Sequence, residues 1–225
     1  MKQKFSLVFM LMATMMAVCL IASNIFTTKV FSVGGIILTG DLLIFPVSYI
    51  LNDCISEIYG YRKTRLAIWM SFGFDFFFIL FAQIVVAIPG AGFWDGGEHF
   101  DYIFSMEVKV VLASLLAFLV GSTVNAAVMS RMKVASHGRH FWMRAILSSV
   151  AGDLADSLIF MPIVFWSVGV RQLLFMIVCQ VCTKVLYETI LLPVTRRVVE
   201  YFKKKDATDV YDDGISYNPF KLGDI

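Results

Sequence analysis

Two aspartates, Asp153 and Asp156, stand three residues apart in an otherwise apolar run that is long enough to span a lipid bilayer. A charge near the middle of a spanning helix costs roughly 2.5 to 3.5 kcal/mol on insertion scales. These carboxylates are therefore expected to be paired with a cation, hydrated, protonated or used to hold a ligand.

A lysine and a glutamate lie in the next apolar run, one helical turn apart. Lys184 falls near the middle of this run, and Glu188 follows it at i, i+4. A lysine so deep in a membrane requires a counter-ion, and Glu188, Asp153 and Asp156 are all eligible. The sequence thus predicts a buried ion pair and leaves its acidic partner open.

An earlier apolar run ends in a second polar set, Asn52, Asp53 and Glu57. The two carboxylates are one turn apart and share one face of a helix. They are candidates for ligand binding, or they pair with the basic residues that follow, Arg62, Lys63 and Arg65. Asp41, at the start of the same run, is expected to cap the helix N-terminus.

Two further amides, Asn24 and Asn125, lie within apolar runs, where such side chains commonly bond one helix to another.

Cys179 and Cys182 form a C-x-x-C pair, but no second pair of ligands accompanies it. Neither a metal nor a cofactor is therefore expected.

The composition is that of a polytopic membrane protein. Of its 225 residues, 59% are hydrophobic and 16% are charged, whereas a soluble domain carries about 25% charged residues. Roughly 20 apolar residues are needed to cross about 30 Å of hydrocarbon as a helix. The sequence predicts an all-α fold with six transmembrane helices over residues 5–27, 41–57, 66–88, 108–130, 141–164 and 173–199.

The basic residues are divided unevenly between the two sides of the membrane that these helices imply. Of the 19 lysines and arginines, all but Lys29, Lys109, Arg171 and Lys184 fall on the side that holds the two termini. Cytoplasmic segments carry the excess of Lys and Arg, so both termini are expected in the cytoplasm. Residues 1–200 are predicted to form the membrane domain, and the polar residues 201–225 a disordered cytoplasmic tail.

Two local patterns refine this architecture. Residues 27–33 and 36–39 are rich in β-formers and flank Gly34 and Gly35, which predicts a small β-hairpin between the first two helices. Gly40-Asp41-Leu42 and Gly152-Asp153-Leu154 stand in the second helix of each three-helix half. This pairing is typical of a 3+3 inverted repeat, although a match this short also arises by chance.

Three motifs occur in order along the chain: Asn52-Asp53-x-x-x-Glu57-x-Tyr59-Gly60-Tyr61-Arg62, Ser149-x-x-Gly152-x-x-x-Asp156-Ser157-x-x-Phe160, and Lys184-x-x-Tyr187-Glu188 followed by Pro193. Together, over residues 23–197, they resemble the queuosine precursor transporter family, the vitamin-uptake-like six-helix transporters. The resemblance implies import of 7-deazaguanine bases across the bacterial inner membrane, with no nucleic acid as partner. The position of Asp153 varies in that family, so Glu57 and Asp156 carry over more directly.

A deazaguanine base presents N1–H and an exocyclic amine as parallel donors, which one carboxylate accepts, and a carbonyl oxygen that needs a donor. The resemblance therefore implies a substrate site drawn from Asn24, Asn52, Asp53, Glu57, Asn125, Asp156, Lys184 and Glu188. Protonation of Asp156, or of Asp153, would couple uptake to a proton gradient. A homodimer is expected because six helices make a thin wall around a heterocycle.

Two other classes remain open at this point. The substrate-binding subunit of an ATP-driven vitamin importer has a similar size and helix count. Ala151-Gly152-Asp153 resembles part of an aspartyl protease motif, but Val150 stands where that motif requires glycine. The sequence also contains neither H-E-x-x-H nor G-x-S-x-G, so enzyme activity is not expected.

Overall fold

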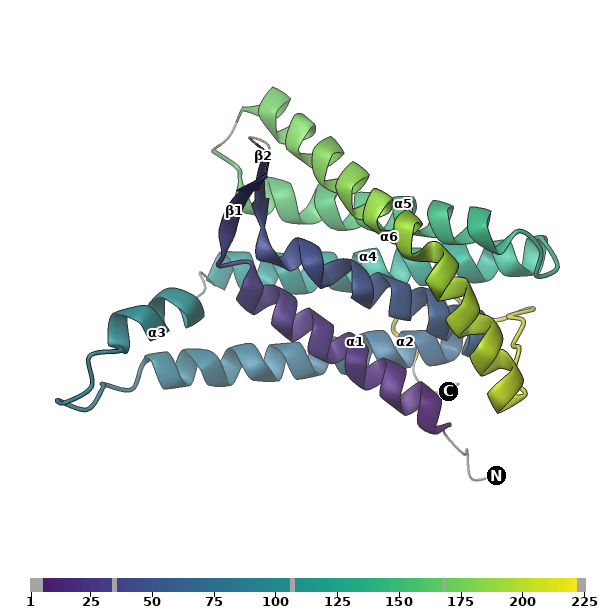
Figure 1. The fold of residues 1–225 in the computed structure, drawn as a ribbon, viewed down its shortest axis with the longest axis horizontal. Helices are drawn as coiled ribbons and strands as arrows, with labels where there is room; N and C mark the ends of the chain where they lie inside the picture. Colours follow the sequence, from purple (N-terminus) through teal and green to yellow (C-terminus); the bar gives the residue numbers. More distant parts are fainter. Residues whose placement is uncertain (1–5, 34–35, 106–107, 168, 222–225) are drawn as a thin grey trace.

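The computed structural model describes residues 6–33, 36–105, 108–167 and 169–221. Its long helices lie beside one another and form an elongated bundle (Figure 1). In chain order the described elements are α1 (Leu7–Phe26), β1 (Val30–Val33), β2 (Ile36–Thr39), the 3₁₀ turn η1 (Gly40–Leu43), α2 (Phe45–Val86), α3 (Gly97–Phe104), α4 (Val108–Ala135), α5 (Phe141–Val164) and α6 (Val170–Asp206).

Among the described residues, five helical segments are long and apolar enough to cross a membrane: α1, η1 together with α2, α4, α5 and α6. Large apolar side chains project outward from them, whereas many polar and charged side chains are buried between the helices. This distribution is the reverse of that in a soluble protein and suits a surrounding lipid phase. The chain is therefore a multi-pass membrane protein, and α5 begins and ends where the sequence predicts.

Helix α2 reverses direction at Gly60. The backbone there has φ 80° and ψ 171°, which divides α2 into residues 45–59 and 61–86, and the two halves run in opposite directions in Figure 1. Glycine is needed because a positive φ strains other residues and because a Cβ would lie 2.7 Å from the Asp212 carboxylate. The loop predicted between residues 57 and 66 is thus wrong, since one residue makes the turn.

Asp41 lies in η1 and does not cap α2. The cap position of α2 is Ile44, and a proline stands in its first turn, where the fixed φ of proline suits a helix start. The predicted capping role of Asp41 is therefore wrong, because the helix begins four residues later than expected.

The two β-prone segments form strands β1 and β2, which pair antiparallel with Val30 opposite Thr39 and Phe31 opposite Leu38. Gly34 and Gly35, the predicted turn residues, lie outside the described part of the chain.

Helices α4 and α5 approach closely because each has a glycine at the contact. A Cβ on Gly121 would lie 2.4 Å from the Tyr49 hydroxyl, and one on Gly152 would lie 2.7 Å from Cβ of Asn125. The absence of side chains lets the two backbones meet and leaves room for the Tyr49 ring between them.

The C-terminal segment after α6 packs against the helix ends, so the disorder expected beyond residue 201 is not found in its described part. Asp212 is buried, and its Oδ2 accepts hydrogen bonds from the Tyr61 N–H at 2.7 Å and the Ser130 hydroxyl at 2.5 Å. The N–H of Val210 donates to the Ile58 carbonyl at 3.2 Å. Asp212 thus satisfies a backbone donor of the helix that restarts after Gly60, as an N-cap residue does.

Three further contacts hold the same segment. Arg65 donates to the Asn218 carbonyl at 2.8 Å, and the Trp69 indole donates to the Pro219 carbonyl at 2.7 Å. Lys133 donates to Asp209 at 2.6 Å. Partial burial alone would raise the pKa of the Asp209 carboxyl group. The hydrogen bonds from Lys133 and Lys203 nevertheless hold this pKa below its usual range. We call residues 207–220 the C-terminal clasp.

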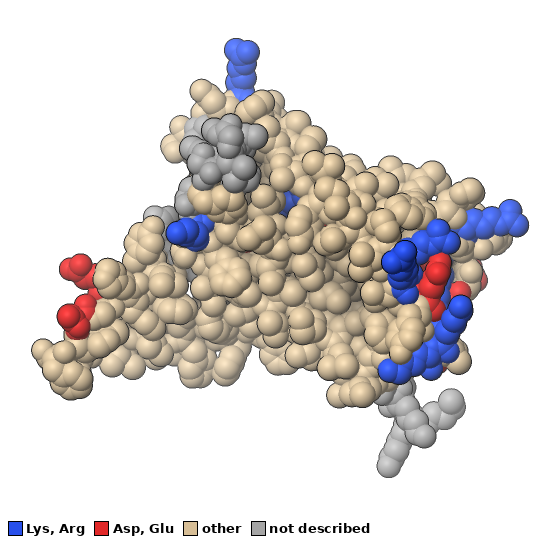
Figure 2. Space-filling model, in the orientation of Figure 1, with Lys and Arg blue, Asp and Glu red and all other residues tan. Residues whose placement is uncertain are grey.

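Charged side chains gather at the end of the bundle that holds the C-terminal clasp. Figure 2 shows most of the visible Lys and Arg side chains at that end, whereas two acidic side chains mark the opposite extremity. The N-terminal end of α1 reaches the same place, because Ser6 bonds Asp206 and the Tyr59 hydroxyl donates to Asp206 at 2.5 Å.

Candidate functional site

The first half of α2 carries a row of side chains that face the interior of the bundle. Phe45, Tyr49, Asn52, Asp53 and Glu57 recur at helical spacing and so lie on one face, and all five are buried. Helices α4 and α6 pack against α2, and α5 packs against both of them. The row therefore follows the axis of the bundle from its β-strand end towards its clasp end.

An ion pair occupies the part of the row nearest the strands. Lys184 Nζ on α6 lies 2.9 Å from Asp156 Oδ2 and 3.9 Å from Asp153 Oδ1 on α5. The same ammonium lies 4.1 Å from the centre of the Phe45 ring, a cation–π contact. The buried pair predicted from the sequence is present, and Asp156 is its acid. One lysine faces two carboxylates, so the cluster holds more acid than base.

A pair of amides forms the next part of the row. The Asn52 amide donates to Asn125 Oδ1 and to the Ser122 carbonyl, each at 3.0 Å. Asn52 Oδ1, Asn125 Nδ2 and the Tyr49 hydroxyl are buried without a hydrogen-bond partner. Leaving such an atom unpaired costs about 1 to 3 kcal/mol. Several unpaired atoms at one place therefore indicate a site for a polar ligand.

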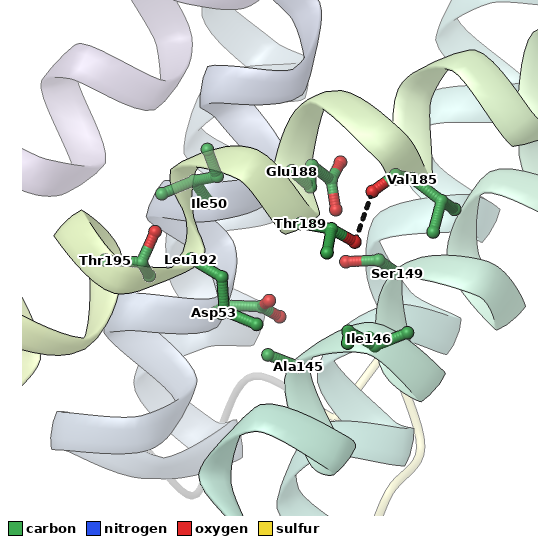
Figure 3. A pocket seen from close by; sticks show the side chains of 10 residues that line it. All are labelled: Ile50, Asp53, Ala145, Ile146, Ser149, Val185, Glu188, Thr189, Leu192 and Thr195. Atoms are coloured by element: carbon green, nitrogen blue, oxygen red, sulfur yellow. Dashed lines mark hydrogen bonds between the residues drawn. The ribbon is translucent and has the colours of Figure 1, made fainter.

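A pocket lies beside the amide pair, between α2, α5 and α6. Asp53, Ser149 and Glu188 contribute the polar side chains that project towards it (Figure 3). Both carboxylate oxygens of Glu188 lack a hydrogen-bond partner, and Asp53 receives one long contact from Ser148, at 3.4 Å. The enclosed part of the pocket has room for about one water molecule.

Glu57 ends the row in a network of cations. Arg144 on α5 bonds both Glu57 carboxylate oxygens, at 2.5 and 3.1 Å, and Lys203 on α6 donates to it at 2.7 Å. Lys133 on α4 lies 4.0 Å away. Glu57 is 2% exposed and Arg144 is fully buried. The alternative pairing with the cations that follow Gly60 is wrong, because the partners of Glu57 come from three other helices.

Asn24 is the one predicted site residue whose described contacts lie elsewhere. Its amide donates to both Asp75 oxygens, at 3.0 and 2.8 Å, and its Oδ1 accepts from the Ser114 hydroxyl at 3.0 Å. These residues belong to α1, the second half of α2 and α4. Of the eight predicted residues, the structure therefore places three in the row on α2 and four beside it on α4, α5 and α6. Asn24 belongs to a separate cluster.

Three partners of the row were not anticipated as site residues. From the sequence, Arg144, Lys133 and Lys203 count only among the basic residues on the side of the two termini, because nothing beyond their charge and approximate position is visible there. The only signal for Arg144 was its place in the first turn of an apolar helix. Its contact with Glu57 depends on how α5 is rotated, which hydropathy does not reveal.

No group of three His, Cys, Asp or Glu side chains in the described residues is arranged to hold a metal ion. The row instead combines acceptors, amide and hydroxyl donors, and aromatic rings, all away from water. Such a set recognises a flat polar molecule by hydrogen bonds and ring contacts. The fold and the row together define a multi-pass membrane protein with a buried polar region between its helices.

The chain belongs to the family described as "Putative vitamin uptake transporter", whose model matches residues 39–198. It is 25% identical over 146 residues to the "Probable queuosine precursor transporter" of Bacillus subtilis (strain 168), a match covering 64% of each chain. It is 23% identical over 145 residues to the "Queuosine precursor transporter" of Escherichia coli (strain K12), covering 64% of this chain and 63% of that one. The chain thus spans a little under two thirds of each relative's length. No solved structure matches it significantly.

Proposed function

We propose that this protein imports 7-deazaguanine precursors of queuosine across the bacterial inner membrane. The observation that carries the proposal is the set of buried and partly unpaired polar atoms on α2, α4, α5 and α6, in a chain whose curated relatives are named as queuosine precursor transporters. The role is transport, and no chemical step on the substrate is invoked.

The row supplies what a deazaguanine edge requires. Asp153 and Glu188 each present carboxylate oxygens without a hydrogen-bond partner, which suit the ring N–H and the exocyclic amine of the base. Asn125 Nδ2 and the Tyr49 hydroxyl are unpaired donors for its carbonyl oxygen, and the Phe45 and Tyr49 rings offer a surface for its flat face. A molecule with the wrong pattern of donors and acceptors would leave these groups unpaired and would be rejected.

Binding requires the helices to separate, because the pocket beside Asp53 has room for only about one water molecule. At the clasp end, Glu57 joins α2 to α5 and α6 through Arg144 and Lys203. We therefore reassign Glu57 from substrate binding to an ionic gate that closes this end. The gate opens when the three helices move apart, which is one way for a transporter to expose its site to one side at a time.

The finer topology follows from the same proposal. With α2 divided at Gly60, the chain crosses the membrane six times, and the positively charged end with both termini faces the cytoplasm. The β1–β2 pair then lies at the outer mouth.

The two halves of the chain are related as an inverted repeat, with Asp41 and Asp153 at corresponding places. Two copies form a homodimer that thickens the wall around the substrate.

Uptake of a labelled 7-deazaguanine into vesicles that contain only the purified protein tests this function. Asp153→Asn and Glu188→Gln should each lower the apparent affinity about 10- to 100-fold, because each removes a charged acceptor for a donor of the base, worth roughly 1.5 to 3 kcal/mol. Glu200→Gln, at an exposed ion pair with Arg196, is the matched control and should transport normally. Unchanged uptake in both site variants would refute the site. If the wild type takes up no substrate in the absence of an ATPase, the proposal that this protein is itself the transporter is refuted.

A further inference from the structure

Asp75 is a carboxylate buried in a bundle region that the substrate row does not use. Its side chain is fully buried in the second half of α2. It accepts two hydrogen bonds from the Asn24 amide on α1, and Asn24 in turn accepts one from Ser114 on α4. The cluster of Asp75, Asn24 and Ser114 therefore joins three helices through neutral donors.

The helix segments that pack around this cluster provide no described cation. Residues 7–26 of α1 and 110–130 of α4 contain no Asp, Glu, Lys, Arg or His, and Asp75 is the only such residue among 66–86 of α2. The other titratable group in these segments is the thiol of Cys19. Lys109 precedes the α4 segment, with its side chain outside the described atoms, and α3 carries the exposed Glu98, His99, Asp101 and Tyr102. The cations of α2 and α4 lie outside these segments, at Arg62, Lys63, Arg65, Arg131 and Lys133.

This arrangement differs from that of Asp156 and Glu57 in the substrate row, which are paired with cations. Asp156 has the ammonium of Lys184 at 2.9 Å, and Glu57 has Arg144 and Lys203. An isolated ionised carboxylate in an apolar interior is far more costly than a paired one, and such groups in membrane helices typically carry protons.

The same three side chains can satisfy Asp75 in either protonation state. In the arrangement observed, the Asn24 amide donates to the carboxylate and the Ser114 hydroxyl donates to Asn24 Oδ1. If the carboxyl group is protonated, turning the Asn24 amide over places Oδ1 to accept the new O–H, while Nδ2 donates to the Ser114 oxygen. Each of the three side chains keeps at least one hydrogen bond in either state, although the second carboxyl oxygen of Asp75 has a donor only in the charged state. The cluster therefore suits a reversible proton site.

We propose that Asp75 is the proton-binding site that couples uptake to the proton gradient, in place of Asp153 or Asp156. A proton from the outer side forms an O–H bond on the carboxylate, and the same bond breaks when the proton leaves towards the inner side, with no redox change. Proton exchange accompanies relative movement of α1, α2 and α4, because Asp75 is closed to solvent between them. The coupling role rests on the proposed transport function, whereas proton binding by Asp75 does not.

Infrared titration of the protein in lipid vesicles measures proton binding directly, through the carbonyl band of a protonated carboxylic acid. Asp75→Asn should remove one titrating band. Ser71→Ala, which truncates a buried and unpartnered hydroxyl one turn away on the same helix, should retain it. If the amide variant does not fold, Asn24→Leu keeps the carboxyl group and should shift the midpoint of its titration by about one pH unit, because hydrogen bonds to the charged form are lost.

Uptake in the same vesicles measures coupling. For one proton per substrate, each unit of pH difference should raise wild-type accumulation about tenfold, and Asp75→Asn should abolish this gain while Ser71→Ala retains it. Asp75→Asn with an unchanged infrared titration, or Asn24→Leu with an unchanged midpoint, would overturn the proton site. A lost band with gradient-driven accumulation intact would overturn the coupling role. A lost band in a protein whose wild type takes up no deazaguanine would support the site and refute the proposed transport function.

Discussion

The Glu57 network permits a quantitative test of how the clasp end is held together. Arg144 is fully buried and Glu57 is 2% exposed, and breaking a buried ion pair by removing one partner typically costs about 3 to 5 kcal/mol. For Arg144→Met we expect the lower end of this range, about 3 kcal/mol, because Lys203 remains 2.7 Å from Glu57.

The reverse change, Glu57→Met, should cost about 4 to 5 kcal/mol. It leaves Arg144, Lys203 and Lys133 facing one another around the position of a lost carboxylate. The double variant should cost less than the sum of the two single changes by about 2 kcal/mol or more, because it removes both buried charges together.

The free energies are measured by reversible unfolding in mixed micelles for the wild type, both single variants and the double variant. Glu200→Gln breaks an exposed pair on α6 whose side chains are 51% and 54% exposed; such pairs contribute about 0 to 1 kcal/mol, so this variant is the control. Additivity of the two buried changes to within about 0.5 kcal/mol would refute the inferred coupling. An equal loss of unfolding free energy in the control variant Glu200→Gln would refute it as well.

Three further predictions concern the packing of the bundle and of its C-terminal clasp. Gly152→Ala should destabilise the fold by about 1 to 3 kcal/mol, because its Cβ would meet Asn125 and Tyr49 at 2.7 and 2.9 Å; Gly73→Ala on α2, where nothing lies within 4 Å, should be neutral or stabilising in the same unfolding assay. Asp212→Ala should speed hydrogen exchange of the Tyr61 N–H about 5- to 30-fold, since a lost N-cap costs about 1 to 2 kcal/mol. Because the folded pKa of Asp209 is lowered, its contribution to the C-terminal clasp should be complete above its unfolded pKa of about 3.9 and disappear as pH falls below that value. Exchange in the Asp212 variant equal to wild type, or release of the clasp already near neutral pH, would contradict this account.

The C-terminal clasp and the Glu57 network lie at the same end of the molecule. Lys133 and Lys203 each contact both Glu57 and Asp209, so the network that joins the helices also holds the segment after α6. Movement at Gly60 would therefore affect the C-terminal clasp, because Asp212 bonds the next residue in the chain. The closed end of the bundle is stabilised by contacts from residues 150 positions apart or more.

The amino-acid sequence by itself determined the membrane class, the position of most helices and the presence of a buried Lys184 pair. Each of these depends on a property that can be read along the chain: the length of an apolar run, or the high cost of an unpaired charge in lipid. The sequence also indicated seven residues that the fold places in or beside one row: six belong to its three motifs, and the seventh, Asn125, is an amide within an apolar run. No local signal, however, showed that Gly60 alone would reverse α2.

Only the tertiary structure decided which groups meet. Whether Lys184 pairs with Asp156 or Glu188 depends on the rotation and register of α5 and α6, and a shift of one residue turns a side chain by about 100° around its helix. Helix rotation and register also decide which cations surround Glu57. For the same reason Asn24 bonds Asp75 and lies apart from the row on α2. The polar tail offered no apolar pattern to predict its packing, because it is held by hydrogen bonds to helix ends whose positions are known only in the assembled bundle.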